Sequence, residues 1–192
     1  LFCEGVGENT PDIANASRPI TDSETERCRK NGVSDVVEVE IGYDGIVIAN
    51  RNGAALFDLT KREIFMALAR DLPDRQGKPA RNPHTKWKDI HPRLPNRAIE
   101  VYGPPPTSGT RDAFVELVME EGCGHFPEFA AAYPDAKERS KKCHLLREDG
   151  GYIDSGEDDN IIVQKLVSNE NAMGILGYSF YMENASKIQV NK

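Results

Sequence analysis

The chain has 192 residues, and 24 Lys and Arg residues against 31 Asp and Glu residues give it a net charge of −7. Apolar residues make up 39% of it, charged residues 29%, and the mean hydropathy is −0.55. No apolar run reaches the roughly 18 residues that a membrane-spanning helix needs, so we predict no membrane span within these residues. The acidic charge balance argues against nucleic acid as a partner, because non-specific binding to it needs a basic surface. A small anion stays compatible with this charge, since a few backbone N–H groups and one or two arginines can hold it.

The four cysteines form two sequence-local pairs: Cys3 with Cys28, and Cys123 with Cys143. We expect two disulfides, each closing a loop of about twenty residues and contributing about 3 kcal/mol. Disulfides imply an oxidising compartment, either the periplasm or the exterior. His125 and His144 each lie near a cysteine, so a metal site is one alternative and four reduced, buried thiols are another. The chain opens on Leu1 and not on Met, and we interpret it as processed or cut.

The first quarter of the chain is predicted to form a helix and then two strands: Thr21–Asn31, Val36–Ile41 and Ile46–Ala49. Thr21 or Asp22 would cap the start of the helix and Gly32 its end. The first strand alternates in polarity, and the second is wholly apolar, which is typical of a strand buried on both faces.

Thr60 and Glu63 are spaced as a capping box and predict the next helix. Its apolar face is formed by residues at helical spacing: Ile64, Phe65, Leu68 and Leu72. Residues 71–95 are rich in Pro, Gly, Lys and Arg, and they are predicted to form a long surface loop that Trp87 anchors.

The second half begins with a strand at Ile99–Tyr102 and, after three prolines, a helix whose apolar side carries Phe114, Leu117 and Val118. One or two short helices are expected over 126–142. The acidic run 154–159 predicts a helix start, with an apolar face made of Ile161, Ile162, Leu166 and Val167. A strand, a helical turn and a last strand follow: Met173–Tyr178, Ser179–Asn184 and Lys187–Val190. Because strands and helices alternate, we predict an α/β fold with a mainly parallel sheet.

The stretch 99–114 holds the pattern that points to chemistry. The first backbone N–H groups of a helix lack intrahelical partners and point outward, with the positive end of the helix dipole behind them. Gly109 lets an anion approach this backbone closely, and Ser108 and Thr110 add hydroxyl donors. Arg111 can offer a bidentate guanidinium. The pattern therefore predicts an anion cradle, with an ordinary helix cap and a surface arginine as the alternative.

Two further patterns are weaker. Ser17 and Arg18 precede the first helix and could turn a hydroxyl and a guanidinium towards a strand end, where open α/β sheets bind ligands; an exposed arginine before a turn is the alternative. The acidic run 154–159 suggests Ca²⁺, but it lacks the Gly and Glu placement of a known calcium loop, and a solvated helix start is favoured.

Four segments occur in order: Thr10-Pro-Asp-Ile-Ala-Asn-Ala-Ser-Arg-Pro-Ile20, Ile41-Gly-Tyr-Asp-Gly-Ile-Val47, Ser108-Gly-Thr-Arg-Asp-Ala-Phe114 and Gly174-Ile-Leu-Gly-Tyr178. Together they resemble the phosphate-binding, periplasmic substrate-binding proteins of ABC transporters. The resemblance implies the type II periplasmic-binding-protein fold, with two α/β lobes that hinge strands join and that close on dehydrated phosphate. Residues 1–47 plus 177–192 would belong to lobe one, here incomplete, and 48–176 to lobe two.

The resemblance implies that phosphate is bound by residues of both lobes: Ser17, Arg18, Ser108, Gly109, Thr110 and Arg111. Family members often carry an aspartate where Ser17 stands, as the acceptor for the proton on phosphate, and an arginine where Pro104 stands. Arg18 and Arg111 are the substitutes for that positive charge. Sulfate has no proton to donate, so the acceptor decides the selectivity. The candidates for it here are Asp44 and Asp112.

The expected function is a periplasmic, secreted or cell-surface receptor that passes inorganic phosphate to an ABC transporter permease. It implies no catalysis, cofactor or metal. Family members have further segments on both sides, so another chain or segment would complete lobe one. One alternative is an oxyanion sensor or scavenger without a transporter. The other is a phosphate-ester hydrolase with Ser108 as nucleophile and His125 or His144 as base.

Overall fold

A computed structural model describes residues 2–16, 18–43 and 45–191. The chain divides into two compact units, which we call the N-terminal unit (Leu1–Asp44) and the C-terminal unit (Gly45–Lys192). None of the helices among the described residues is long and apolar enough to cross a membrane.

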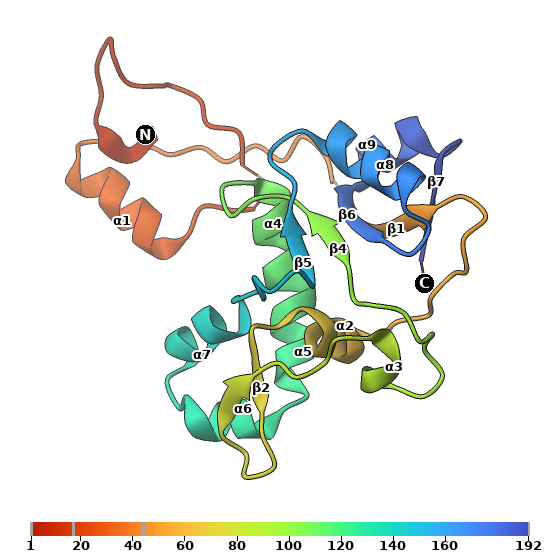
Figure 1. The fold of residues 1–192 in the computed structure, drawn as a ribbon. Helices are drawn as coiled ribbons and strands as arrows, with labels where there is room; N and C mark the ends of the chain where they lie inside the picture. The colour runs from red at the N-terminus through yellow and green to blue at the C-terminus, as the bar shows by residue number, and fades with distance from the viewer. Residues whose placement is uncertain (1, 17, 44, 192) are drawn as a thin grey trace. The chain divides into compact units, whose positions relative to one another are not determined.

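The N-terminal unit is built on a 3₁₀ turn, η1 (Phe2–Glu4), and the helix α1 (Asp22–Lys30) (Figure 1). The predicted Cys3–Cys28 disulfide joins them. Thr21, one of the two residues expected to cap α1, does so through a complete capping box with Glu24. The helix ends one residue earlier than expected: Asn31 is the C-cap, and Gly32 follows it with φ of +83°, a conformation that favours glycine.

The predicted strand Val36–Ile41 is wrong for the described chain, where residues 33–43 form neither helix nor strand. Val37, Val39 and Ile41 are 82%, 71% and 93% exposed. Alternating polarity suits a strand only where another strand takes up its backbone hydrogen bonds, and none of the described strands pairs with this segment.

The C-terminal unit holds, in its described part, a five-stranded sheet in the order β5-β4-β6-β1-β7. The strands are β1 (Ile46–Arg51), β4 (Val101–Gly103), β5 (Tyr152–Asp154), β6 (Met173–Gly177) and β7 (Ile188–Val190). β4 runs parallel to both β5 and β6, whereas β1 is antiparallel to β6 and β7. The α/β class is confirmed, and the sheet is mixed and not mainly parallel because β1 runs against its neighbours.

The sheet separates two apolar layers. Ile175 of β6 joins the larger layer, which includes Phe65, Trp87 and Phe114, whereas the next residue, Leu176, joins the smaller layer with Leu166. This alternation along β6 shows why the strand is apolar throughout and buried at every position. Ile46–Ala49 of β1 likewise contributes to both layers, as its composition predicts.

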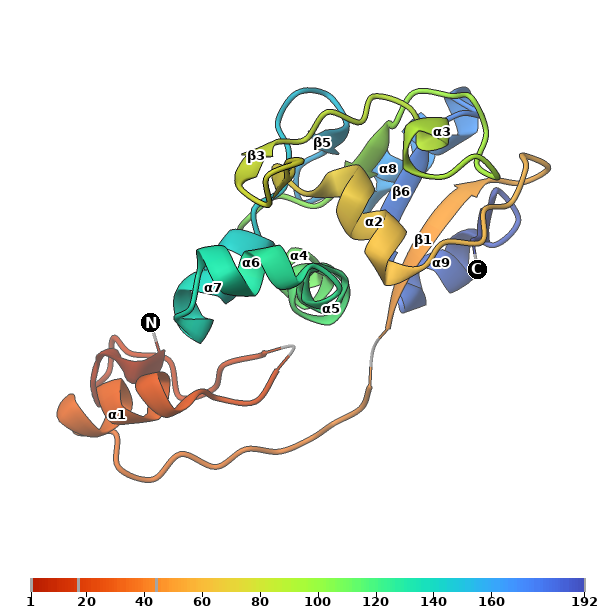
Figure 2. The ribbon, with the colours of Figure 1, turned by 90° about the horizontal axis from the view of Figure 1, so that it is seen from below.

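The helices lie on these two layers (Figures 1 and 2). Those of the larger layer are α2 (Lys61–Leu68), α3 (Trp87–Ile90), α4 (Gly109–Phe114), α5 (Glu120–Gly124), α6 (Pro127–Ala132) and α7 (Ala136–Cys143). Those of the smaller layer are α8 (Asp159–Ser168) and α9 (Tyr178–Asn184). A second disulfide, Cys123–Cys143, joins α5 to α7 as predicted.

The expected loop 71–95 contains regular structure. A hairpin of β2 (Asp71–Pro73) and β3 (Pro79–Arg81) and the helix α3 interrupt it. Trp87 anchors it as predicted: the side chain is 1% exposed, and its ring packs edge-on against that of Phe57, with 5.3 Å between the ring centroids. Trp87 thus ties the segment to the core.

Two predicted apolar faces are partly wrong. A π-helical stretch, Val115–Met119, joins α4 to α5 and buries Val115 and Met119, which leaves Leu117 61% exposed. The wider turn of a π-helix rotates the following residues relative to α-helical spacing. On α8, Ile161 and Val167 are 40% and 43% exposed, and Val163 is buried between Ile162 and Leu166. The buried face of α8 is therefore narrower than the apolar face that the sequence predicts.

Candidate anion-binding site

Three helix starts follow the parallel strands β4, β5 and β6 of the C-terminal unit (Figure 1). Strands that run in parallel end at the same edge of a sheet, so α4, α8 and α9 all begin near one edge. Their first backbone N–H groups and helix dipoles favour negative charge there. This is also the edge at which open α/β sheets bind ligands.

Ser108 is the N-cap of α4, with an extended backbone at φ −85° and ψ 135°. In the described chain its hydroxyl makes no capping bond to the helix. Gly109 is exposed, and Ser108 and Thr110 are half-buried. The helical run that starts here continues through the π-helical stretch to the end of α5. The structure therefore brings Ser108, Gly109 and Thr110 together at the start of a long helical run.

Arg111 lies at the same place and is held by its surroundings. Its guanidinium carbon is 4.5 Å from the centre of the Tyr152 ring, and its Nη1 donates to the Pro104 carbonyl oxygen at 3.4 Å. Tyr152 is 7% exposed, and its hydroxyl donates to the same carbonyl at 2.6 Å. Burial raises the pKa of Tyr152, and the positive charge of Arg111 acts in the opposite direction. The ring therefore stays neutral beneath the arginine.

The acidic run 154–159 lies beside this helix start. Thr107 donates a hydrogen bond from its hydroxyl to Glu157. Asp154 and Asp158 accept backbone N–H groups of Gly156 and Asn160, each at 2.9 Å. These bonds confirm the helix start predicted for this run, with Asp158 as N-cap of α8. Burial, and then the charges of Asp158 and Glu157, raise the pKa of Asp159.

Arg18 belongs to the N-terminal unit and makes a forked ion pair with Glu24. Its Nη1 and Nη2 lie 2.9 Å from the two carboxylate oxygens. The same carboxylate accepts the backbone N–H and the hydroxyl of Thr21, so the pKa of Glu24 falls to about 2, with Arg18 as the largest cause. Ser17 and Asp44 lie outside the described residues. Asp112 is exposed in the first turn of α4.

The histidines that the hydrolase alternative needs lie elsewhere. His144 Nε2 is 2.8 Å from Glu120 Oε2, and Ser140 donates to the same oxygen. Glu120 is twelve residues beyond Ser108 on one helical run, about 18 Å at the usual rise. His125 caps the far end of that run. Neither histidine is placed to act as a base for Ser108.

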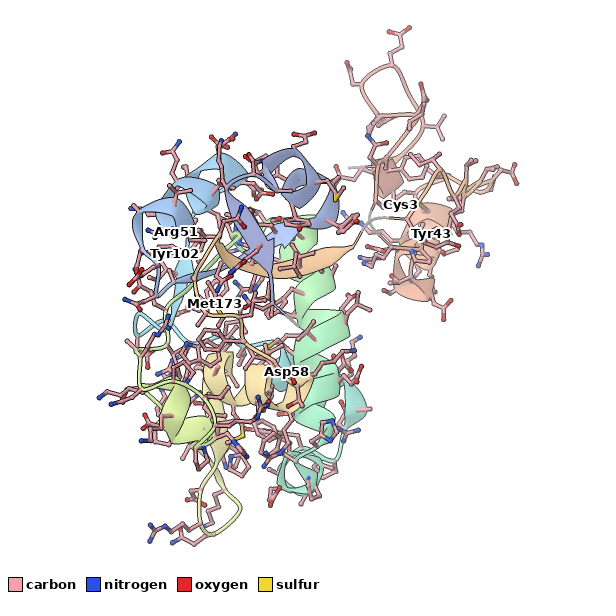
Figure 3. The ribbon with its side chains drawn as sticks, turned by 90° about the vertical axis from the view of Figure 1, so that its right-hand side faces the viewer. Cys3, Tyr43, Arg51, Asp58, Tyr102 and Met173 are labelled. Carbon is pink, nitrogen blue, oxygen red and sulfur yellow. A yellow bond between two sulfur atoms is a disulfide. The ribbon has the colours of Figure 1, made fainter. Side chains whose placement is uncertain are left out.

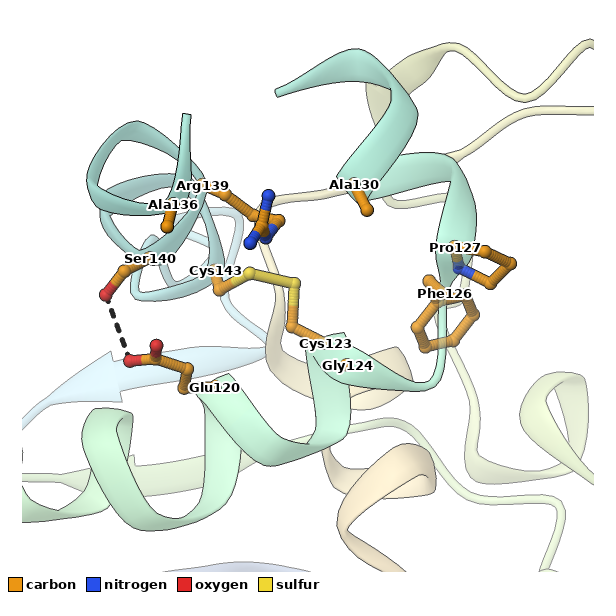
Figure 4. A pocket seen from close by; sticks show the side chains of 10 residues that line it. All are labelled: Glu120, Cys123, Gly124, Phe126, Pro127, Ala130, Ala136, Arg139, Ser140 and Cys143. Carbon is orange, nitrogen blue, oxygen red and sulfur yellow. Dashed lines mark hydrogen bonds between the residues drawn. A yellow bond between two sulfur atoms is a disulfide. The ribbon is translucent and has the colours of Figure 1, made fainter. Parts of the chain in front are cut away.

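A hollow of about 300 Å³ lies around the second disulfide (Figure 4). Phe126, Arg139 and Ser140 are among the side chains that line it, together with the disulfide itself. Because Cys123 and Cys143 are bonded to each other, they are not available as thiolate ligands for the metal site considered above. Among the described residues, no group of three or more His, Cys, Asp or Glu could hold a metal ion.

A family model described as the PBP superfamily domain matches residues 1–192. The chain belongs to this superfamily. It is 28% identical over 188 residues to the protein SphX of Synechococcus elongatus, and 30% identical over 182 residues to the phosphate-binding protein PstS of Staphylococcus saprophyticus. These alignments cover 98% and 93% of the chain and 44% of each relative.

A solved structure of a possible phosphate-binding protein from Planctomyces limnophilus has the same fold. It superposes with a TM-score of 0.58 at 27% identity, over 92% of this chain and 50% of that one. The chain thus spans about half the length of the relatives that it matches. The fold recognised from the four sequence segments is confirmed.

Two neighbours of the cradle were not recognised as such from the sequence. Tyr152 has no motif of its own, and Glu157 was assigned only to the acidic helix start; both lie beside the cradle because β5 pairs with β4. The signal that could have found them is the placement of two consecutive parallel strands side by side, which brings residues from the ends of both strands to one edge.

Proposed function

We propose that the residues at the start of α4 form the larger part of the phosphate site of an extracytoplasmic receptor. Ser108, Gly109, Thr110 and Arg111 would hold inorganic phosphate at the start of α4, and the receptor would pass it to an ABC transporter permease. The observation that carries this is the alignment of the Arg111 guanidinium, by Tyr152 and Pro104, at a helix start with two hydroxyl donors. Charge-assisted hydrogen bonds of this kind are the strong ones.

The two-lobe arrangement belongs to this proposal. Residues 1–47 and 177–192 would form part of lobe one and 48–176 lobe two, with Ser17 and Arg18 reaching the ligand from lobe one. Asp44 or Asp112 would accept the proton that phosphate carries and sulfate lacks. The relatives named for phosphate support this ligand, and segments outside the chain would complete lobe one.

Calorimetric titration of the purified chain with phosphate and then sulfate tests the proposal. We expect phosphate to bind more tightly than sulfate. The Arg111→Ala variant should lose at least tenfold in affinity, since a hydrogen bond to a charged group contributes about 1.5–3 kcal/mol. Arg81→Ala is the matched control, because the Arg81 side chain is 78% exposed on β3.

Equal affinity of the Arg111→Ala variant and the parent would remove Arg111 from the site. Tighter binding of sulfate would overturn the phosphate assignment. A folded chain that binds neither anion would contradict the proposal that these residues carry the site.

A further inference from the structure

One buried side chain, Tyr152, contacts both Pro104 and Arg111, the residues that flank the turn between β4 and α4. Its hydroxyl donates to the Pro104 carbonyl oxygen at 2.6 Å, and its ring lies under the Arg111 guanidinium at 4.5 Å. At Gly103, the last residue of β4, a Cβ atom would come within 2.4 Å of the Tyr152 hydroxyl oxygen. Glycine at 103 is therefore what lets the ring lie against the strand end.

The partner of Arg111 is an aromatic face, and this matters for an anion site. A carboxylate partner orients a guanidinium but cancels its charge, as Glu24 does at Arg18. The face of a neutral ring also attracts and orients a guanidinium, while leaving its full positive charge to act on a third group. A phenol is neutral at physiological pH, and burial raises the pKa of Tyr152 further.

A side chain that is already ordered loses less conformational entropy when a ligand binds. Arg111 is held by the ring and by the Pro104 carbonyl, which also accepts the Tyr152 hydroxyl. The Tyr152 side chain and the Pro104 carbonyl thus hold both the turn and the guanidinium. Pre-ordering one long side chain corresponds to roughly threefold to tenfold in affinity.

We propose that Tyr152 is a positioning residue of the anion site: it aligns the Arg111 guanidinium without neutralising it and holds the preceding turn in the shape that binds the anion. This inference rests on the proposed function for the identity of the anion. The alignment of Arg111 itself is a property of the ligand-free chain and can be measured without any anion.

Two variants separate the roles of the ring and the hydroxyl. Tyr152→Phe keeps the ring under Arg111 and removes only the bond to Pro104, whereas Tyr152→Leu removes both. We expect phosphate affinity to fall about threefold in Tyr152→Phe and at least tenfold in Tyr152→Leu. The control is Tyr102→Phe on the adjacent strand, which removes a 2.7 Å hydrogen bond from its hydroxyl to Glu100 and should change affinity less than twofold.

A double-mutant cycle decides whether Tyr152 acts through Arg111. In an Arg111→Ala background, the loss caused by Tyr152→Leu should shrink to about threefold or less. An equal loss in both backgrounds would overturn the proposal, because the ring would then act only on the stability of the turn. Wild-type affinity in Tyr152→Leu would overturn it as well.

NMR of the ligand-free chain supplies the anion-independent measurement. The Arg111 side-chain protons should show a ring-current shift and restricted motion in the parent and in Tyr152→Phe, and neither in Tyr152→Leu. If the parent fails to bind phosphate but this pattern holds, the phosphate function falls and the alignment of Arg111 stands. A mobile, unshifted Arg111 in the parent overturns the positioning role, whatever the chain binds.

Discussion

The two units of the chain hold their structure by different means. Among the described residues of the N-terminal unit, Cys28 is the only buried one, and a disulfide, a capping box and ion pairs supply its ordered contacts. The C-terminal unit buries two apolar layers against a sheet. Local polar contacts and one cross-link can therefore order a short segment that lacks a core, whereas the larger unit relies on burial.

The same difference extends to the two arginines that were predicted to bind phosphate. Arg18 is held by a carboxylate that also caps a helix, and Arg111 is held by a buried ring and a backbone carbonyl. The first arrangement depends on charge, and so on pH. The second depends on packing, and so on the integrity of the core.

Removing the Cys3–Cys28 disulfide should produce the largest effect. With Cys3→Ser and Cys28→Ser together, we expect α1 to lose its amide protection entirely, because the cross-link spans 25 residues around a unit without an apolar core. Hydrogen exchange followed by NMR measures this, and the amides of β1 and β6 should keep their protection.

The matched control replaces Cys123 and Cys143 with serine. Their separation of 20 residues corresponds to about 3 kcal/mol, so the C-terminal unit should be destabilised but remain folded. Protected α1 amides in the Cys3→Ser, Cys28→Ser variant would show that the N-terminal unit has another source of stability.

Truncating the core of the C-terminal unit should have the next largest effect. Leu166 is fully buried on α8, and Leu166→Ala should lower the free energy of unfolding by about 2–5 kcal/mol. Its neighbour Val167 is 43% exposed, so Val167→Ala should cost less than about 1 kcal/mol. Denaturant unfolding monitored by circular dichroism compares the two, and similar losses would contradict the orientation of α8.

Prediction from sequence succeeded where the signal is local. The capping box of Thr60 with Glu63 forms as expected, because three-residue spacing alone brings its groups together, and Thr21 is the N-cap of α1 as one of the two residues expected there. The strand predicted at Val36–Ile41 failed because a strand needs a partner that no local pattern guarantees.

The candidate site follows the same division. Ser108, Gly109, Thr110 and Arg111 could be grouped from the sequence because they are consecutive and open a helix. Tyr152 could not be, because its contact with Arg111 depends on the parallel pairing of Val101 with Tyr152, which are fifty-one residues apart in the sequence. Strand order is a property of the whole fold, and it cannot be read from either segment alone.

The smallest expected effect concerns the pH dependence of the N-terminal unit. Because the pKa of Glu24 is about 2 in the folded chain and 4.5 otherwise, its contribution to stability should be complete above pH 4.5 and lost as the pH falls towards 2. NMR titration of the Glu24 carboxyl carbon measures the midpoint. Arg18→Gln should raise it, since Arg18 is the largest cause of the shift.

Arg27→Gln is the control for this titration, because Arg27 pairs with Glu4 at 3.0 Å and not with Glu24. It should leave the Glu24 midpoint where it is. A midpoint near 4.5 in the parent chain would mean that the forked pair does not form in solution.

The burial of Trp87 determines the fluorescence of the protein. Trp87 is the only tryptophan of the sequence, it is 1% exposed, and its indole nitrogen has no hydrogen-bond partner among the described residues. Such an indole emits at short wavelength, and the emission moves to the red when water reaches it. Its fluorescence therefore reports on the C-terminal unit alone, whereas Tyr43, 91% exposed in the N-terminal unit, emits as a solvated phenol (Figure 3). The chain thus carries a built-in optical label that distinguishes the melting of its core from the loosening of its disulfide-bonded N-terminal unit.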